Sequence, residues 1–341
     1  MNVLVTSASR KVSLVRSFQR AVAPLGGRVV AADCEERSAA LFLADRARLL
    51  PRSDAPDFWD ALVEVIRDEQ ISLLIPTRDE ELPLFAARVD ELRALGVTVP
   101  ISSSRTIALC QDKFAFAQLC EDRGFSVATR VAADELADPA RYPVFARTRS
   151  GKGGRGAFRV DSRAELDRLG AVHGPLLVQE LVRAPELSID VLADLEGRVL
   201  SVVPRERATV VAGESYVSRT VHDPALVRLG ARLAEAVALR GHAVIQVFDR
   251  RPSELGRIDV IELNPRFGGA SALAFEAGAD SAELVVRMAR GERIAPFVGG
   301  YEVGLTMLRY TQDVFVRPRD LEGIHVARGL VRSGRHALQR A

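Results

Sequence analysis

The sequence is poor in cysteine and has no long apolar run. Its three thiols are Cys34, Cys110 and Cys120. An odd count without paired spacing argues against a disulfide framework and against a zinc site, so we expect reduced thiols in a cytoplasmic protein. The apolar run at residues 1–5 is followed by basic residues, the reverse of the order in a signal peptide. No run approaches the roughly 20 residues of a membrane span.

An excess of charge of one sign is also absent. The 341 residues carry 47 basic and 45 acidic side chains, for a formal net charge of +2. A charge this small gives no reason to expect nucleic acid or a membrane surface as a partner. Hydrophobic residues make up 48% of the chain, so it has enough apolar surface to fold rather than remain disordered. The length suggests about two domains.

The first hundred residues alternate apolar strands with amphipathic helices. Strands are predicted at residues 2–6, 28–32 and 71–75, and helices at 57–69 and 81–95. Such alternation indicates a parallel sheet with crossover helices. We therefore expect residues 1–100 to form a small doubly wound α/β domain.

The first strand lacks the glycine-rich turn that a dinucleotide site requires. The loop after it reads TSASR at residues 6–10, and without glycines the backbone cannot approach a pyrophosphate closely. A dinucleotide dehydrogenase is therefore not expected. Polar residues at 6–11, at Asp33 and at 77–81 follow the ends of predicted strands, where ligands of such sheets bind. Ordinary polar loops and helix caps are the alternative interpretation.

A glycine-rich connection marks the middle of the chain. Predicted strands at 142–147 and 157–160 flank a loop with glycines at Gly151, Gly153, Gly154 and Gly156. Two strands around such a loop make a hairpin, and the Walker pattern is absent because a glycine follows Lys152. Glycines expose backbone N–H groups and allow close approach to phosphates, and Lys152, Arg155 and Arg147 add positive charge. A mobile surface hairpin is the alternative.

The segment DVIELNPR at residues 259–266 is the strongest local signal. Side chains alternate along a strand, so Glu262 and Asn264 are predicted to share one face, with Ile261 and Leu263 in the core. If this strand pairs with the predicted strand at 242–248, Gln246 adds an oxygen beside Glu262.

Three oxygen ligands, completed by phosphate oxygens, suit Mg²⁺. Pro265 ends the strand and leaves Arg266 at its mouth, where its charge could balance a transferring phosphoryl group. An ordinary detail of a strand edge is the alternative interpretation of this motif.

Taken in order, these motifs resemble the ATP-grasp superfamily, most closely the ATP-grasp half of the carbamoyl-phosphate synthase large subunit. The resemblance covers roughly residues 1–315. It implies a mixed α/β and α+β fold. Residues 1–100 would form the pre-ATP-grasp domain and residues 101–316 the ATP-grasp domain, with a glycine-rich lid subdomain at about 127–186. Residues 317–341 would be an Arg-rich appendage. The motifs are Asp112-Lys113, PVFAR at 143–147 with the glycine loop, VQELV at 178–182, PELSID at 185–190, Gln246 and IELNPR at 261–266.

The resemblance also implies roles for individual residues. Lys113 and Arg147 would hold the phosphates of ATP, with Arg266 as the third catalytic cation. The metal ligands would be Gln246, Glu262 and Asn264, holding Mg²⁺ or Mn²⁺. Many relatives carry glutamate where this chain has Gln246, which suggests weaker metal binding. The remaining nucleotide-binding residues would be Gly151, Lys152, Gly153, Gly154 and Gly156 in the lid, Glu180, Leu181 and Val182 in the adenine hinge, and Glu186 at the ribose.

The chemistry implied is ATP-dependent activation of a carboxylate as an acyl phosphate, which an amine then attacks, with release of ADP and phosphate. The predicted partners are a small carboxylate and a small amine. A homodimer is one assembly considered, but the sequence does not fix the oligomeric state. The arginines predicted at the acceptor site have planar guanidinium groups, which bind carboxylates well. The alternative is that these arginines are solvated residues at strand edges. A bicarbonate- or carbamate-phosphorylating enzyme and a non-catalytic ATP-binding module remain as rival functions. The predicted acceptor residues are Arg205, Arg207, Glu214 and Arg219.

Overall fold

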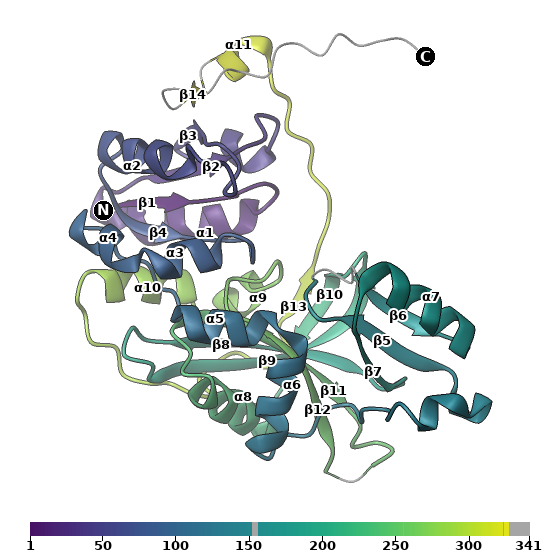
Figure 1. The fold of residues 1–341 in the computed structure, drawn as a ribbon. Helices are drawn as coiled ribbons and strands as arrows, with labels where there is room; N and C mark the ends of the chain where they lie inside the picture. Colours follow the sequence, from purple (N-terminus) through teal and green to yellow (C-terminus); the bar gives the residue numbers. More distant parts are fainter. Residues whose placement is uncertain (152–155, 255, 323, 327–341) are drawn as a thin grey trace. The chain divides into compact units, whose positions relative to one another are not determined.

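The computed structural model describes residues 1–151, 156–254, 256–322 and 324–326 (Figure 1). Two compact units can be separated. Unit 1 contains Met1–Pro100, Ala282–Arg293 and the described residues from Thr311 onward, and unit 2 contains Ile101–Ser281 and Ile294–Tyr310. Unit 1 thus contains two later segments, which the sequence predictions placed outside the first domain. Among the described residues, no helix is long and apolar enough to cross a membrane.

Unit 1 is built on a five-stranded sheet in which every pairing is parallel, in the order β14-β3-β2-β1-β4. The chain adds β2 and β3 on one side of β1 and then β4 on the other. Right-handed crossovers in opposite directions place the connecting helices on opposite faces, which confirms the doubly wound prediction. The strands are β1 (Asn2–Val5), β2 (Val29–Asp33), β3 (Arg46–Leu49), β4 (Ile71–Ile75) and β14 (His325–Val326).

Three sequence predictions for unit 1 need correction. Strand β3 was not predicted, because RARL carries two arginines and has no continuous apolar run. The helix expected at 81–95 is two helices, since Arg88 between them has φ −117° and ψ 22°. The predicted appendage after residue 316 contributes β14, which pairs with β3. The helices of this part are α1 (Val12–Val22), α2 (Phe58–Asp68), α3 (Leu82–Ala87), α4 (Val89–Ala94), α10 (Ser281–Ala289) and α11 (Pro318–Glu322).

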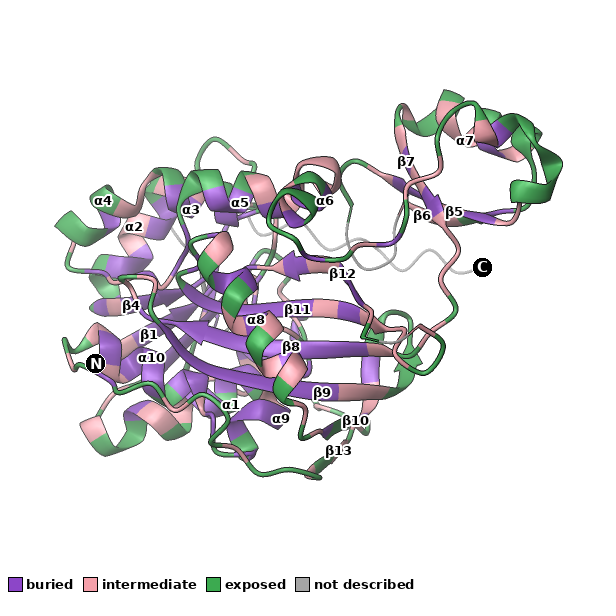
Figure 2. Cartoon of the chain, turned by 90° about the horizontal axis from the view of Figure 1, so that it is seen from below, coloured by how far each residue is buried: buried purple, intermediate pink, exposed green. Residues whose placement is uncertain are grey.

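Unit 2 is built on a six-stranded antiparallel sheet in the order β12-β11-β8-β9-β10-β13. Figure 2 shows β8, β9 and β11 buried along most of their length. Further helices are α5 (Ser104–Gln111), α6 (Lys113–Asp122) and α9 (Ala272–Glu276). The strands are β8 (Glu186–Ala193), β9 (Val199–Val211), β10 (Glu214–Thr220), β11 (Gly241–Asp249), β12 (Ile258–Asn264) and β13 (Thr306–Leu308).

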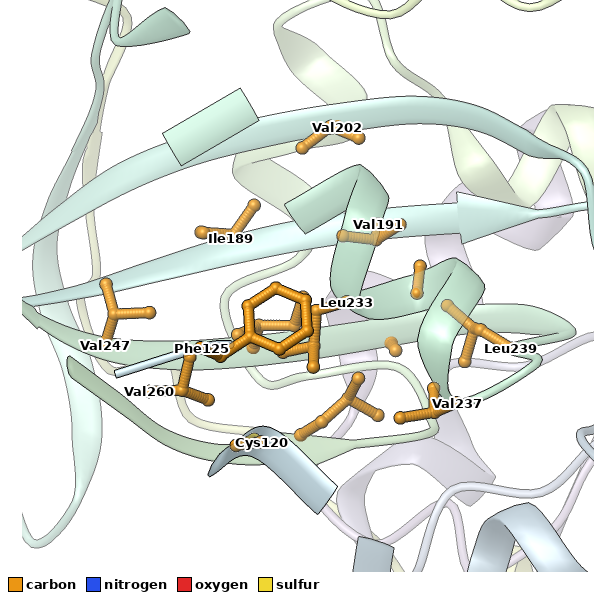
Figure 3. Close-up of a cluster of buried hydrophobic side chains, with 14 of the residues drawn as sticks. Cys120, Phe125, Ile189, Val191, Val202, Leu233, Val237, Leu239, Val247 and Val260 are labelled. Atoms are coloured by element: carbon orange, nitrogen blue, oxygen red, sulfur yellow. The ribbon is translucent and has the colours of Figure 1, made fainter. Parts of the chain in front are cut away.

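Helix α8 (Pro224–Ala236) packs on this sheet through an apolar face on which Leu226 and Leu233 are fully buried. Figure 3 shows Leu233 within the cluster of buried side chains. Asp223 caps the helix by accepting from the backbone N–H groups of Ala225 and Leu226. Gly230 faces the sheet, where an added Cβ would lie 2.8 Å from a methyl carbon of Val202. The close approach of α8 therefore depends on the missing side chain.

A smaller antiparallel sheet in the same unit has the order β6-β5-β7. Its strands are β5 (Val144–Thr148), β6 (Ala157–Val160) and β7 (Leu176–Glu180), and α7 (Arg163–His173) packs on it through Leu166. The connection between β5 and β6 is the predicted glycine-rich hairpin. Within it, Lys152, Gly153, Gly154 and Arg155 lie outside the described residues.

We predict that Gly230→Ala destabilises the protein, because the new methyl group overlaps Val202 and displaces α8. Overpacking of this kind costs about 1–3 kcal/mol. The matched control is Gly170→Ala in α7, where no atom lies within 4 Å of an added Cβ. There the change should be neutral or should raise the free energy of unfolding, because alanine favours helix. Urea unfolding of both variants measures the difference, and equal effects would contradict the packing argument.

Candidate active site

A cavity of about 320 Å³ lies in unit 2 and is lined by residues of both its sheets. The small sheet contributes residues of β5, β6 and β7, and the central sheet contributes residues of β8, β9, β11 and β12. Ten of the residues predicted from sequence line it, which brings together positions spread over 150 residues of chain. They are Lys113, Arg147, Gly151, Glu180, Leu181, Val182, Glu186, Arg207, Gln246 and Glu262.

The predicted pairing of two strands forms the acidic wall of the cavity. Strands β11 and β12 are antiparallel, and Gln246 lies opposite Glu262 in the register. The next pair is Val247 with Val260, so Ile261 is an extra residue in a β-bulge. The prediction that Ile261 points into the core is therefore wrong: Ile261 is only half-buried and lines the cavity.

The predicted metal ligands converge on one carboxylate. The amide nitrogen of Asn264 donates to Glu262 Oε1 at 2.8 Å. In the amide orientation that satisfies both neighbours, Gln246 also donates to Glu262 Oε1, at 2.7 Å, and accepts from Arg207 Nη1 at 2.6 Å. Arg266 Nη2 donates to Asn264 Oδ1 at 3.4 Å. The four side chains form a connected set, although Asn264 and Arg266 do not line the cavity.

The donor chemistry of this set fits a hard cation that takes further ligands from elsewhere. Glu262, Gln246 and Asn264 offer one carboxylate and two amide oxygens. Within the described ranges, no group of three or more His, Cys, Asp or Glu residues is arranged to hold a metal ion. A cation held here would therefore need additional oxygens, such as those of phosphate groups.

Arg147 is a buried cation in the wall of the cavity. Its side chain donates to Gln179 Oε1 at 2.8 Å and to the carbonyl of Ile261, at the bulge, at 3.3 Å. Its Nε is buried and makes no hydrogen bond within the described residues. Burial lowers the pKa of Arg147, and the negative charge of Glu262 opposes this shift. A buried guanidinium with spare hydrogen-bonding capacity suits an anionic ligand.

Gln179 was missed by the sequence reasoning, although it lies in the quoted VQELV segment. It is 2% exposed, accepts from Arg147 and donates to the carbonyl of Ala128 at 2.8 Å. It therefore orients Arg147 toward the cavity. Its position on β7 directly opposite Phe145 of β5 follows from strand pairing, which the sequence does not specify.

Lys113 begins helix α6, and Asp112 caps this helix by accepting from the backbone N–H groups of Phe114 and Ala115. The Lys113 ammonium donates to the carbonyl of Gly151 at 2.6 Å, and its backbone N–H donates to the carbonyl of Arg149. The start of the glycine-rich connection is therefore attached to α6. Gly156, at the other end, has φ +75° and does not line the cavity.

The acidic residues of the segment 180–186 are held by arginines. Glu180 accepts from Arg250 at 2.6 Å and from Arg257 at 3.1 Å, two partners that sequence reasoning did not identify. Glu186 is ion-paired with Arg207, which also donates to the carbonyl of Gly213 at 2.8 Å. Burial raises the pKa of Glu186, and the charge of Arg207 opposes this rise.

Three of the four predicted acceptor residues lie away from the cavity. Arg205 is 3% exposed and donates to Asp190 at 2.7 Å in a buried ion pair, which corrects its assignment to substrate. Arg219 pairs with Glu206, and Glu214 pairs with Arg309. A substrate role for Arg219 and Glu214 stays a prediction. The alternation of side chains along a strand does not distinguish Arg205 from Arg207, because both lie on the same face of β9.

The Arg205–Asp190 pair belongs to a buried network that supports the segment after β12. His242 Nε2 lies 3.2 Å from Asp190 Oδ1 and 3.0 Å from Ser271 Oγ, and its ring stacks on Phe267 at 4.5 Å. Ser271 Oγ in turn accepts from the backbone N–H of Gly268 at 3.0 Å. The loop that follows Asn264 is therefore held in place by side chains of the central sheet.

Two family models match the chain. The PylC-like, N-terminal domain family matches residues 3–100, and the family described as ATP-grasp in the biosynthetic pathway with Ter operon matches residues 173–306. These matches support an ATP-grasp protein.

Curated relatives agree with this assignment. The chain is 27% identical over 245 residues to the carbamoyl phosphate synthase arginine-specific large chain of Bacillus subtilis, covering 66% of this chain and 22% of that one. It is 29% identical over 281 residues to the N-terminal section of the carbamoyl phosphate synthase large chain of Methanopyrus kandleri, covering 74% and 48%. The ATP-grasp chain thus spans less than half the length of these relatives.

Among solved structures, the fold is similar to that of the biotin carboxylase–β,γ-ATP complex from Campylobacter jejuni. The TM-score is 0.71 at 16% identity, covering 89% of this chain and 74% of that one. This similarity supports the ATP-grasp architecture for nearly the whole chain.

We predict that Asp190→Ala lowers the free energy of unfolding by about 3–5 kcal/mol, because it leaves the Arg205 charge buried without a partner. The control is Glu206→Ala, which breaks the exposed pair with Arg219. Exposed pairs contribute about 0–1 kcal/mol. Urea denaturation compares the variants, and a small effect of Asp190→Ala would show that the buried network is dispensable.

We expect Glu180 to contribute to the stability of the folded protein in a pH-dependent way. Burial would raise its pKa, but hydrogen bonds from Arg250 and Thr129 dominate and lower the pKa from 4.5 to about 2. A depressed pKa in the folded state adds stability above about pH 4.5 that is lost as the pH falls toward 2. Glu180→Gln should therefore be less stable than the wild type at pH 6, and the difference should narrow at pH 3. A constant difference in unfolding free energy would contradict this.

Proposed function

We propose that this ATP-grasp protein is an ATP- and Mg²⁺-dependent ligase. It activates a carboxylate as an acyl phosphate and joins it to an amine, with release of ADP and phosphate. The observation that carries the proposal is the joint placement of Arg147, Lys113 and Glu262 around one cavity. Cations that meet phosphate oxygens and a carboxylate that can hold a divalent ion are the two requirements of phosphoryl transfer.

The phosphate end of the cavity is assigned to Arg147 and Lys113. The buried Nε of Arg147 has hydrogen-bonding capacity that a phosphate oxygen would satisfy. Glu262, Gln246 and Asn264 would hold Mg²⁺, with Mn²⁺ as the alternative ion. When bound, the metal would offset negative charge on the phosphates. Arg266, which donates to Asn264, would add positive charge beside it.

The other end of the cavity suits a purine base. Apolar side chains of Phe145, Phe248 and Val260 line it together with Leu181 and Val182. The Glu180 side chain is occupied by arginine partners, so the 180–182 segment would meet the base through its backbone groups. Glu186 would accept hydrogen bonds from the ribose beside its pair with Arg207.

The acceptor is proposed to be a small carboxylic acid and the nucleophile a small amine, such as an amino acid. A bicarbonate- or carbamate-phosphorylating activity is the second candidate, favoured by the similarity to carbamoyl phosphate synthase large chains. ATP turnover that depends on bicarbonate would distinguish it from the first. The homodimer stays a prediction.

The direct test is to incubate the protein with ATP, Mg²⁺ and a panel of carboxylic acids and amines. The proposal expects ADP and phosphate that depend on both an acid and an amine. Formation of AMP and pyrophosphate would contradict an acyl phosphate intermediate. ATP binding without turnover across the panel would favour a non-catalytic module.

We predict that Glu262→Gln lowers kcat for ADP formation by on the order of 100-fold, because the substitution removes the only carboxylate among the proposed metal ligands. The matched control is Glu235→Gln on the exposed face of α8, which should leave kcat unchanged. Added Mg²⁺ should rescue Glu262→Gln poorly. Turnover equal to that of the wild type would exclude Glu262 from the site.

A further inference from the structure

A second cavity, of about 340 Å³, lies in unit 1 and is not used by the proposed ligase activity. It is lined by residues that follow the carboxyl ends of four strands: Thr6 and Ser7 after β1, Asp33 and Cys34 after β2, residues 50–54 after β3, and Arg78, Glu80 and Glu81 after β4. The sheet order reverses between β1 and β4. Open parallel sheets bind their ligands at this point, beyond the ends of the strands.

Two buried carboxylates in the wall of this cavity have no cationic partner among the described residues. Asp33 is 8% exposed and accepts from the backbone N–H groups of Ser9 at 2.7 Å and Glu35 at 3.0 Å. Glu81 is 1% exposed and accepts from the backbone N–H groups of Thr77 and Arg78 and from Ser7 Oγ. Within the part of the chain that the structure describes, neither forms an ion pair. Buried carboxylates are ordinarily paired, so this wall attracts a positively charged group.

An independent observation concerns the loop after β1. The Thr6 hydroxyl is buried, lines the cavity and makes no hydrogen bond within the described residues. Ser7 has φ 47° and Ser9 has φ 45°, and residues other than glycine rarely adopt such left-handed backbone conformations. Thr77 Oγ1 holds the loop by donating to the carbonyls of Thr6 and Ser7. Strained, tightly held loops with unused polar groups are typical of ligand sites.

Two positively charged side chains, Arg52 and Arg78, lie in the exposed part of the cavity lining. Arg52 pairs with Asp54 at 3.1 Å, and Arg78 pairs with Glu80 at 3.1 Å. Both guanidinium groups are more than half exposed, and exposed pairs are weak enough to exchange for another carboxylate. The cavity therefore offers, in its buried wall, two acids that form no ion pair with a described residue, and exchangeable arginines in the exposed part of its lining.

We propose that this cavity binds an α-amino acid, with its ammonium group toward Asp33 and Glu81 and its carboxylate on Arg52 and Arg78. The volume is within the range of small-molecule sites. The ammonium group supplies the cation that the two buried carboxylates lack. The inference rests on unit 1 alone and does not require ligase activity.

Cys34 provides the readout, because it lines this cavity and is exposed. Cys110 and Cys120 are buried, and burial raises the pKa of each to about 12, so they serve as unreactive internal references. The full chain is treated with N-ethylmaleimide, without nucleotide, in the presence of each common L-amino acid in turn. Site-resolved mass spectrometry then gives the alkylation rate of Cys34. At least one amino acid should slow it several-fold, whereas its N-acetyl derivative should not.

Two variants test the assigned contacts. Arg78→Ala removes an exposed cation and should abolish most of the protection, while Arg16→Ala, on the exposed side of α1, should retain it. Glu81→Gln keeps the size of the side chain and should also lose protection, with circular dichroism confirming that it is folded. Protection by no amino acid, equal protection by N-acetyl derivatives, or full protection in Arg78→Ala or in folded Glu81→Gln would each overturn the proposal. Because no ATP is present, failure here leaves the ligase proposal untouched.

Discussion

The antiparallel contact between β11 and β12 is the interaction on which the active site depends. It places Gln246 opposite Glu262, and its bulge at Ile261 lies in a run of three consecutive residues that line the cavity, Val260, Ile261 and Glu262. The bulge also presents the Ile261 carbonyl to Arg147. One additional residue in one strand therefore aligns an apolar contact, a carboxylate and a buried cation.

The central sheet carries two ion pairs between neighbouring strands, one buried in the interior and one at the cavity. Along β8 and β9, Asp190 pairs with Arg205 in the interior, and Glu186 pairs with Arg207 at the cavity. The inner pair joins His242 and Ser271 and supports the loop after Asn264. The outer pair borders Gln246. The same combination of residue types thus has a supporting role where water is excluded and a candidate binding role where a cavity is present.

Local patterns predicted most of the elements, and ten of the residues predicted from sequence line the candidate site. The caps at Asp112 and Asp223, the strand at Ile71–Ile75 and the pairing of β11 with β12 follow from short-range periodicity and turn chemistry. Strand β3 was missed because its two arginines hide a short parallel strand. The bulge was not predicted, because the regular alternation of side chains along a strand does not indicate where the strand contains an extra residue.

By itself, the sequence determined the family, the order of the elements and which side chains carry charge and oxygen, because these depend on residue type and spacing along the chain. The tertiary structure alone decided which of those charges remain available to a ligand. Arg205 and Arg207 are two residues apart on one strand face, yet the first is neutralised by Asp190 in the interior and the second borders the cavity. That difference arises from strand pairing and burial, which bring together residues that are distant in sequence.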